Sequence, residues 1–358
     1  MRFGVRGGGM KSFKIKNRSL GPGFPVYLIA EFSGNHHQNF EEAAKMLHAA
    51  KACGADAVKL QAYTPDKITL RSDKEFFKIQ GETNWDGQML YDLYSQACTP
   101  WEWFPKLKEI AQSLNIDLFA TAFDPSAVDF LEELGVPVHK VASFEIVDIQ
   151  LISKMAGTGK PLIISTGMAT LNEIEEAVKT ARNAGAREIA LLKCTSAYPA
   201  EPEEMHLRTI PHLMEIFDVP IGLSDHTMGI AASVSAVSLG ACIIEKHFTL
   251  SRKSPGPDSS FSLEPDEFKA LVEAIRTTEK ALGEIHYGAS SLEVKNRIFR
   301  RSLFVVEDIK AGEKFTSENI RSIRPGMGLH TRHLNEIVGR TAASDLERGM
   351  PLSWDMVI

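Results

Sequence analysis

The sequence contains few cysteines and no long apolar run. Its four cysteines lie far apart and form no CxxC pair, at Cys53, Cys98, Cys194 and Cys242. This pattern indicates neither a disulfide framework nor a zinc site and is typical of reduced thiols in an intracellular protein. No segment approaches the ~20 consecutive apolar residues of a membrane-spanning helix, and the amino terminus lacks the apolar core of a signal peptide. These absences predict a cytoplasmic protein with no membrane partner.

Clustered positive charge is also absent. The chain has 40 Lys and Arg residues against 46 Asp and Glu residues, which argues against a nucleic-acid-binding surface and favours a small-molecule ligand. Hydrophobic residues make up 44% of the 358 residues, so a large core can form. The length exceeds the about 250 residues of one (β/α)8 barrel. We therefore expect one large domain and one small one.

Strand-like and helix-like patterns alternate in eight pairs from Val26 onward. The expected strands cover residues 26–30, 57–60, 118–122, 138–142, 161–165, 189–193, 219–223 and 242–246, and the expected helices begin near Phe40, Pro100, Pro125, Ile149, Leu171, Glu203, Met228 and Glu264. Eight repeats in about 260 residues predict a closed (β/α)8 TIM barrel, an α/β fold. The alternative, an open doubly wound sheet, normally has a glycine-rich phosphate turn after its first strand, and none is present.

The rest of the chain divides around this barrel, which we place at residues 21–283. Residues 1–20 are basic and glycine-rich and are expected to be a disordered leader, and residues 284–299 are expected to be a linker. Residues 300–358 read as a compact β-rich module with short strands and turns. Such a small module is expected to have little core of its own and to bury apolar surface against a barrel. Residues 62–99 are too long for an ordinary connection and favour a lid or a sugar-binding wall, although plain packing remains an alternative.

Two histidines follow neighbouring strands in the stretch from Ile221 to Thr249. His226 comes at the end of one predicted strand and His247 at the end of the next. Because the carboxyl ends of parallel strands meet at one edge of the fold, the two imidazoles should lie close together. Neutral imidazole is a good ligand for a divalent metal. The alternative is that His226 caps a loop and His247 is a hydrogen-bonded core residue.

Other polar residues are expected at the same end of the barrel. They are two carboxylates, two lysines and a set of hydroxyls, at Glu31, Glu145, Lys59, Lys140, Ser143, Ser165, Thr195, Ser196, Tyr198 and Ser224. Lysines with hydroxyl donors suit a phosphate, and carboxylates with a tyrosine suit sugar hydroxyls or a proton transfer. The set therefore suggests that a phosphorylated substrate meets a polyhydroxy carbonyl compound. Each residue taken alone could equally be a salt-bridge partner or a solvated cap.

Eight strings in the sequence together resemble the sialic acid synthase family: AEFSGNHHQ, DAVKLQAYT, HKVASFE, ISTGMAT, KCTSAYPA, GLSDHT, IEKHFTL and RPGMGL. Members of this family join a (β/α)8 barrel to a C-terminal antifreeze-like (SAF) domain and condense phosphoenolpyruvate with an N-acylated sugar aldehyde. Within the family, LQAYTPDKITL, LYDLYSQACTPWEW and ASFEIVDI are most similar to the synthases of pseudaminic acid. The resemblance implies 2,4-diacetamido-2,4,6-trideoxy-L-altrose as the sugar. An N-acetylneuraminate or legionaminic acid synthase is the alternative.

The resemblance also implies roles for single residues. His226 and His247 match the ligands of a divalent metal, with Mn2+ expected and Mg2+ or Co2+ as alternatives. Catalytic roles fall to Glu31, Glu145, Lys59 and Lys140, and one of the two glutamates handles the proton. The phosphoenolpyruvate contacts are Lys59, Lys140, Ser143, Ser165, Ser196 and Ser224, and the residues that face the sugar are Glu31, Glu145, Tyr198 and Asp258. Arg324 matches an arginine that reaches the neighbouring subunit's sugar site, which implies a domain-swapped homodimer.

Two other classes of protein share part of this residue pattern. A metal-dependent TIM-barrel hydrolase would usually carry an HxH pair after its first strand, whereas here Glu31 ends that strand and His36 and His37 are adjacent. A non-catalytic carbohydrate- or ice-binding protein would account for the C-terminal module alone. It would not need two lysines and a histidine pair inside a barrel. Both alternatives fit the residues less well than a synthase does.

Overall fold

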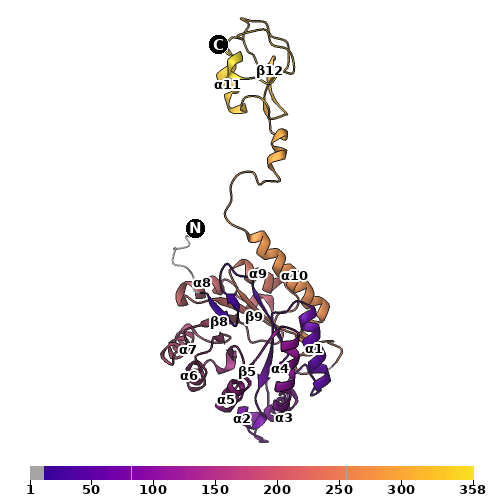
Figure 1. Ribbon diagram of the computed structural model, residues 1–358, viewed down its shortest axis with the longest axis vertical. Coiled ribbons are helices and arrows are strands. Elements are labelled where there is room, and N and C mark those ends of the chain that lie inside the picture. Colours follow the sequence, from indigo (N-terminus) through magenta and orange to yellow (C-terminus); the bar gives the residue numbers. More distant parts are fainter. Residues whose placement is uncertain (1–11, 82, 255) are drawn as a thin grey trace. The chain divides into compact units, whose positions relative to one another are not determined.

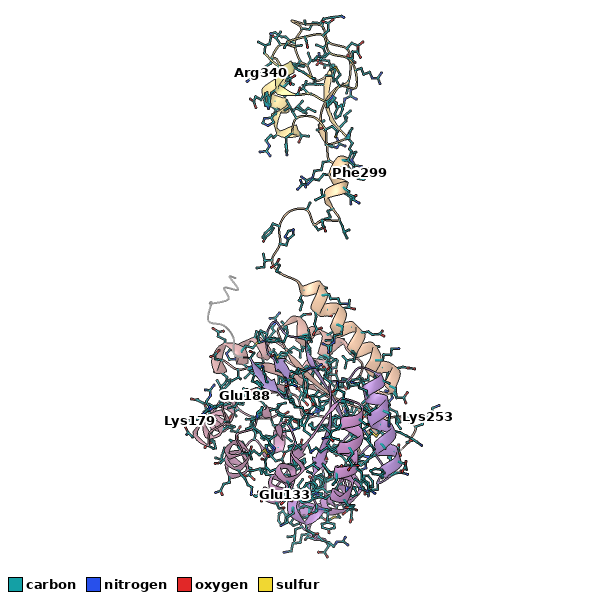
Figure 2. The ribbon with its side chains drawn as sticks, viewed as in Figure 1. Glu133, Lys179, Glu188, Lys253, Phe299 and Arg340 are labelled. Atoms are coloured by element: carbon teal, nitrogen blue, oxygen red, sulfur yellow. The ribbon has the colours of Figure 1, made fainter. Side chains whose placement is uncertain are left out.

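The structure is a computed structural model that describes residues 12–81, 83–254 and 256–358 (Figure 1). The chain divides into two compact units, of which the first ends at Gly283 and the second is Glu284–Ile358. Figure 2 shows the charged side chains of Glu133, Lys179 and Lys253 at the periphery of the first unit. None of the helices in the described ranges is long and apolar enough to cross a membrane.

The first unit is a closed barrel of eight parallel strands, as the sequence predicted. The strands are β3 (Tyr27–Glu31), β4 (Ala57–Ala62), β5 (Asp117–Ala122), β6 (His139–Val141), β7 (Leu162–Ser165), β8 (Ile189–Cys194), β9 (Ile221–Asp225) and β10 (Ile243–His247). They pair in chain order, and β10 closes the barrel by pairing with β3. Each observed strand begins and ends within two residues of its predicted range. The fold prediction is therefore confirmed.

Helices surround the barrel (Figure 1). They are α1 (Phe40–Ala52), α4 (Phe104–Ser113), α5 (Pro125–Leu134), α6 (Ile149–Gly157), α7 (Leu171–Asn183), α8 (Thr209–Phe217), α9 (Ala231–Ser238) and α10 (Pro265–Leu282). Local signals fix several of their ends. Asp124 caps α5 by accepting from Ser126 N at 2.7 Å, and Gly135 ends that helix at φ 68°. Thr170 and Glu173 form a capping box at the start of α7.

Three helix starts predicted from the sequence are wrong by three to six residues. The helix expected near Glu203 is only a 3₁₀ turn at Pro202–Glu204. The α-helix α8 begins later, at Thr209, because the positive φ of 41° at His206 prevents a continuous helix between the two elements. A 3₁₀ turn at Trp101–Trp103 likewise precedes α4. The start of α9 is delayed past Met228 because Gly229 has φ 75°. These turns move the helices without changing the order of the strands.

Close contact between β9 and β10 depends on a glycine in β9. A Cβ atom added at Gly222 would lie 2.5 Å from the carbonyl oxygen of Ile243 and 2.6 Å from Leu192 Cδ2. Only glycine permits this approach without displacement of backbone. The glycine in the GLSDHT string therefore sets the spacing of the strands that carry the two histidines.

The disordered leader expected over residues 1–20 is wrong for residues 13–20. These form an antiparallel hairpin of β1 (Phe13–Ile15) and β2 (Arg18–Leu20), while residues 1–11 lie outside the described residues. Phe13, Ile15 and Leu20 are buried in the core of the barrel unit. Two short apolar-polar alternations give too weak a signal in sequence, and burial against the barrel stabilises them.

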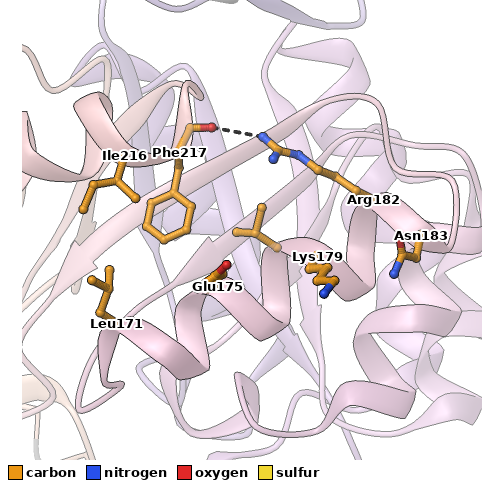
Figure 3. Close-up of a pocket in the computed structure, with 8 residues that line it drawn as sticks. Leu171, Glu175, Lys179, Arg182, Asn183, Ile216 and Phe217 are labelled. Carbon is orange, nitrogen blue, oxygen red and sulfur yellow. Dashed lines mark hydrogen bonds between the residues drawn. The ribbon is translucent and has the colours of Figure 1, made fainter.

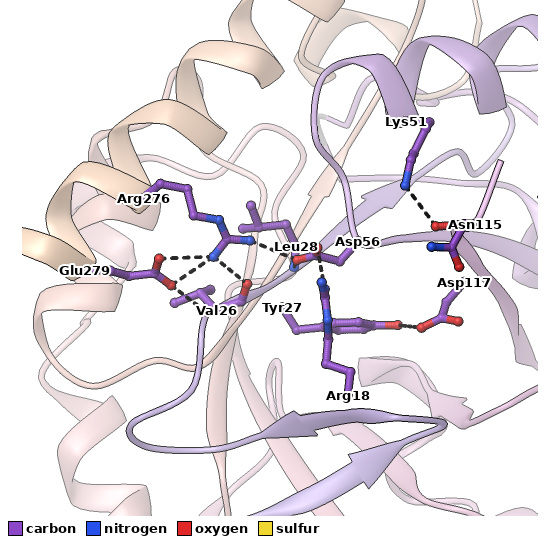
Figure 4. A network of polar contacts seen from close by, with 10 residues as sticks. All are labelled: Arg18, Val26, Tyr27, Leu28, Lys51, Asp56, Asn115, Asp117, Arg276 and Glu279. Carbon is purple, nitrogen blue, oxygen red and sulfur yellow. Dashed lines mark hydrogen bonds and ion pairs between the residues drawn. The ribbon is translucent and has the colours of Figure 1, made fainter.

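Polar contacts around Asp56 join the hairpin to the barrel (Figure 4). Asp56 accepts from Leu28 N at 3.0 Å and from Arg276 at 3.1 Å, and it also pairs with Arg18 of the hairpin. Arg276 in turn donates to the carbonyl oxygen of Val26 at 3.0 Å. The network thus ties the start of β3 to both the hairpin and α10.

We expect Asp56→Ala to destabilise the barrel unit by roughly 2 kcal/mol, because it leaves several part-buried donors without an acceptor. The shift of the urea unfolding transition, followed by circular dichroism, measures the effect. Glu133→Ala is the matched control, since Glu133 is exposed and a substitution there should change stability by less than about 0.5 kcal/mol. Equal transitions for the two variants would contradict the structural role of Asp56.

The second unit has a small core of its own. Nine buried apolar residues form it: Leu303, Val305, Ile309, Phe315, Ile320, Ile337, Ala342, Leu346 and Leu352. Its elements are η6 (Val294–Phe299), β11 (Ser302–Val305), β12 (Ile320–Ile323), η7 (Thr331–His333), α11 (Leu334–Ile337) and η8 (Trp354–Met356). A core of this size agrees with the little core expected for so small a module.

The segment between β4 and α4 has structure of its own. It contains α2 (Pro65–Ile68), η1 (Glu75–Phe77) and α3 (Leu90–Ala97), and an antiparallel bridge joins Lys78 to Met89. Trp85 Nε1 donates to the carbonyl oxygen of Pro257 at 2.8 Å, and Asn84 Nδ2 donates to that of Tyr198 at 2.8 Å. These bonds attach the segment to the ends of the barrel strands.

Candidate active site

A cavity of about 520 Å³ lies at the carboxyl ends of the barrel strands. Eleven of the thirteen site residues predicted from the sequence line it, namely Glu31, Lys59, Lys140, Ser143, Glu145, Ser165, Tyr198, Ser224, His226, His247 and Asp258. They come from strands or strand ends all around the barrel and from the loops that follow. The parallel barrel therefore gathers residues that are far apart in sequence.

Glu31, Lys59 and Glu245 form a buried ion-pair cluster in this cavity. Lys59 Nζ lies 2.6 Å from Glu31 Oε2 and 3.6 Å from Glu245 Oε1. Its ammonium also donates to Thr121 Oγ1 at 3.2 Å, and Ser224 Oγ donates to Glu245 Oε1 at 3.1 Å. The strand register accounts for the cluster, since Glu31 is opposite Lys59 and Glu245 is opposite Ser224.

The two carboxylates of the cluster have opposite pKa shifts. Burial raises the pKa of Glu31 to about 7, although Lys59 opposes the shift. Burial also raises the pKa of Glu245, but Lys140 and Lys59 outweigh it and the net shift is downward. Burial lowers the pKa of Lys59, and Glu245 and Glu31 reverse this to a net increase. Near neutral pH the cluster therefore holds an ionised Glu245, a charged Lys59 and a Glu31 that can exchange a proton.

Lys140 lies beside a group of hydroxyls. Its Nζ donates to Ser165 Oγ at 2.6 Å and to the carbonyl oxygen of Val141 at 2.8 Å. Ser143 Oγ accepts from Gly167 N at 3.1 Å. A Cβ atom at Gly167 would lie 2.2 Å from Ser196 Oγ and 2.7 Å from Ser143 Oγ, so glycine is needed for the hydroxyls to approach. Buried ammonium and hydroxyl groups of this kind form a site for a phosphate or a carboxylate.

His226 and His247 lie side by side, with ring centroids 5.3 Å apart. His226 Nδ1 lies 2.8 Å from the carbonyl oxygen of Thr195, which fixes it as the donor and leaves Nε2 free to ligate. Burial lowers the pKa of His247 well below its usual value, so this imidazole is neutral. Its Nδ1 is buried and has no hydrogen-bond partner in the described parts of the chain.

These features fit a metal held by the histidine pair. Among the described residues there is no group of three or more His, Cys, Asp or Glu side chains arranged to hold a metal ion. Two imidazoles would supply two ligand nitrogen atoms and leave positions for substrate oxygens. Glu245, two residues before His247 in the sequence, adds a buried acceptor, since its Oε2 has no hydrogen-bond partner among the residues that the structure describes.

Three further residues of the predicted site also line the cavity. Burial raises the pKa of Glu145 to about 7, and its Oε2 has no partner within the described ranges. Burial raises the pKa of Tyr198 well above its usual value, so the phenol remains a donor, and its ring centroid lies 4.4 Å from that of His226. Asp258 accepts from Ser33 Oγ, and burial raises its pKa. Each offers a hydrogen bond to a polar substrate.

Two predicted site residues do not line the cavity. Ser196 lies near Gly167, and its Oγ is 3.7 Å from Cys194 Sγ. Arg324 is in the second unit, where it is exposed. The sequence interpretation also missed Glu245 as a member of the site. The alternation of side chains along a strand could have identified it, because Glu245 and His247 are two residues apart and so face the same side of β10, whereas Lys246 faces away and pairs with Asp225 at 2.9 Å.

A second cavity, of about 370 Å³, lies in the outer layer between α7 and α8 (Figure 3). Leu171, Lys179 and Phe217 contribute to its lining, and Arg182 donates to the carbonyl oxygen of Phe217 at 3.0 Å. It contains none of the predicted site residues. The cavity at the strand ends is therefore the candidate active site.

Comparison with known proteins agrees with this site. The chain is 46% identical over 333 residues to pseudaminic acid synthase of Helicobacter pylori, covering 92% of this chain and 97% of that protein. It is 35% identical over 342 residues to N,N'-diacetyllegionaminic acid synthase of Legionella pneumophila, covering 94% and 96%. The crystal structure of N-acetylneuraminic acid synthetase from Leptospira borgpetersenii in complex with citrate is similar with a TM-score of 0.72 and 33% identity, over 80% of this chain and 95% of that chain.

The family comparisons divide the chain in two. Residues 300–358 match the SAF domain. Residues 46–287, which include ten of the eleven predicted residues that line the cavity, match the NeuB family. Since this match covers more than half of the chain, and the similar proteins match it almost from end to end, the chain belongs to the NeuB family.

Proposed function

We propose that this protein condenses phosphoenolpyruvate with 2,4-diacetamido-2,4,6-trideoxy-L-altrose to give pseudaminic acid and phosphate. The observation that carries the proposal is the cavity that Lys59 and Lys140, with the hydroxyls of Ser165 and Ser224, line together with three glutamates and two histidines. The 46% identity to a pseudaminic acid synthase over 92% of the chain supports the choice of sugar.

Phosphoenolpyruvate is expected to bind at the lysines. Its phosphate and carboxylate are anionic, and Lys59, Lys140, Ser143 and Ser165 are the cations and hydroxyl donors of the cavity. Because these groups are buried, their charge acts on the substrate with little screening by water. The ionised Glu245 keeps Lys59 charged.

The proposed reaction requires one proton transfer to the aldehyde oxygen and one from the water that adds to phosphoenolpyruvate. The C2–C3 π electrons of phosphoenolpyruvate form a bond from C3 to the aldehyde carbon, and positive charge develops at C2. The aldehyde oxygen takes a proton, which we assign to Glu145. Water then adds at C2 and gives one proton to a carboxylate. The bond between C2 and the phosphate oxygen breaks, the proton of the new C2 hydroxyl goes to the departing phosphate, and a 2-keto acid remains. A divalent metal held by His226 and His247 would polarise the aldehyde.

The substrate assignment is tested by incubating the protein with phosphoenolpyruvate, Mn2+ and one sugar at a time. We expect kcat/KM for the trideoxy sugar to exceed that for N-acetylmannosamine by at least roughly tenfold, a difference within the range of pocket contacts. Mass spectrometry identifies the keto acid, and phosphate release gives the rate. An equal or higher kcat/KM for N-acetylmannosamine would refute the assignment. The isomeric legionaminic acid precursor belongs in the panel, because a legionaminic acid synthase is the second candidate at 35% identity.

The pH dependence tests the role of Glu145. Its pKa of about 7 means that the carboxyl loses its proton as the pH rises through neutrality. If the protonated form donates to the aldehyde oxygen, kcat should fall as the pH rises above about 7. Glu145→Gln should remove this fall from the pH profile and should reduce kcat by roughly 10²- to 10⁴-fold. The pH profile of phosphate release measures both effects. A kcat that rises through pH 7 would assign Glu145 the role of base instead.

We further propose a homodimer in which Arg324 completes the partner's site. The Arg324 guanidinium is exposed and has no hydrogen-bond or ion-pair partner among the residues described. Its loop is nevertheless fixed, since Ser302 Oγ donates to the carbonyl oxygen of Pro325 at 2.6 Å and accepts from Gly328 N at 2.9 Å. A fixed loop that presents an unpaired guanidinium suits recognition of an acyl carbonyl or a carboxylate.

A further inference from the structure

The cavity has a charged side and an apolar side, which come from different parts of the chain. The charged side chains belong mainly to the strands of the barrel, as Lys59, Lys140 and Glu245 do. The other side, which we term the apolar wall, comes from the segment between β4 and α4 and comprises Ile68, Ile79, Trp85, Leu90, Leu93 and Tyr94. No charged side chain in the described part of that segment lines the cavity.

The apolar wall is held in place by hydrogen bonds. Ile79 N donates to the carbonyl oxygen of Gln88 at 2.8 Å, and Gly87 N donates back to that of Ile79 at 2.9 Å, so Ile79 belongs to a short ladder that ends just before Leu90, the first residue of α3. Trp85 is fixed to Pro257 by its indole donor at 2.8 Å, and its ring centroid lies 5.5 Å from that of Tyr198. The wall is therefore a preformed surface.

The position of the wall determines which part of a substrate it meets. The aldehyde carbon must approach phosphoenolpyruvate among the lysines, on the charged side. The far end of the sugar must then meet lining residues other than these lysines, and the segment that follows β4 supplies most of the apolar ones. A methyl group there is buried favourably against Ile79 and Leu90, whereas a hydroxyl group would lose its water without gaining a partner.

We infer that Ile79 and Leu90 of the apolar wall determine specificity by accepting the terminal methyl group of a 6-deoxy sugar aldehyde and disfavouring a terminal hydroxymethyl group. The inference rests on the proposed function and adds the residues that select the sugar. An apolar pocket rejects an added hydroxyl by roughly 100-fold at most. The wild-type protein should therefore prefer the 6-deoxy sugar by roughly 10- to 100-fold in kcat/KM.

The test compares 2,4-diacetamido-2,4,6-trideoxy-L-altrose with its 6-hydroxy counterpart, at saturating phosphoenolpyruvate and Mn2+. Ile79→Thr, which keeps the branched shape, and Leu90→Asn should each reduce the preference roughly tenfold, mainly through KM for the 6-deoxy sugar. KM for phosphoenolpyruvate should not change. Phe76→Asn is the matched control, because Phe76 lies in the same segment, is 90% exposed and does not line the cavity.

The outcomes separate this inference from the proposed function. If the wild-type protein releases phosphate with neither sugar, the proposed function fails and this inference fails with it. If the protein is active but both wall variants keep the wild-type preference, only the inference is overturned. An equal loss for the two sugars would also overturn it, because the wall would then contact a part that they share.

Discussion

His247→Ala should reduce kcat/KM by roughly 10³-fold or more, the scale of several kcal/mol of charge stabilisation by a metal at a developing alkoxide. The expectation rests on the pairing of His247 with His226 at 5.3 Å between ring centroids and on the neutral state that burial imposes on His247. The variant should also bind Mn2+ at least roughly tenfold more weakly, as measured by isothermal titration without substrate.

The control for this substitution is His212→Ala. His212 is exposed on α8 and is absent from the cavity lining, so its loss should change neither metal binding nor turnover. His226→Ala should repeat the effect of His247→Ala, since each imidazole would supply one ligand. Full activity of the His247→Ala protein after treatment with a chelator would refute a catalytic metal at the pair.

Strand ends are the part of the site that the sequence predicts well. In a parallel barrel each strand delivers its last residues to the same edge, so Lys59, Lys140 and His247 could be placed together from short apolar runs followed by polar residues. The register then explains why Glu31 is opposite Lys59. Glu245 was missed even though it is two residues before His247 and therefore faces the same side of β10.

The wall and the hairpin depend on contacts between distant segments. Trp85 lines the cavity because its indole binds the carbonyl oxygen of Pro257, 172 residues away. No periodic pattern in residues 62–99 indicates this contact. The sequence alone therefore could not show whether this segment is a lid, a sugar-binding wall or a segment that only packs against the barrel. Residues 13–20 likewise form strands because Ile15 and Leu20 find an apolar partner in the barrel. Tertiary burial decides both cases.

For the second unit, the sequence predicts the fold but not the group that Arg324 contacts. Its short strands and turns were recognisable, and the match of residues 300–358 to the SAF domain agrees with them. Our proposal places Arg324 against a second copy of the chain, and neither the sequence pattern nor the unit alone identifies the group that Arg324 contacts. A functional experiment with two variants addresses it directly.

Co-expression of Arg324→Ala and His247→Ala chains should restore activity that neither variant has alone. If Arg324 acts on the partner's site, a mixed dimer has one site in which both residues are intact and one in which both are replaced. Half of randomly paired dimers are mixed, so the ceiling is about a quarter of the wild-type activity per chain. Phosphate release by the co-purified mixture, with each chain carrying a different affinity tag, measures the recovery.

The same experiment gives a different result if Arg324 acts in its own chain. If Arg324 acts within its own chain, every site in a mixed dimer carries one defect and no recovery appears. Arg340→Ala is a suitable control in place of Arg324→Ala, because Arg340 is exposed in the same unit and pairs with Glu336 at 3.6 Å. That variant should be active by itself, so its mixture with His247→Ala should lose activity only in proportion to the His247→Ala chains. Arg324→Lys should remain nearly inactive, because an ammonium group cannot reproduce the planar set of donors of the guanidinium.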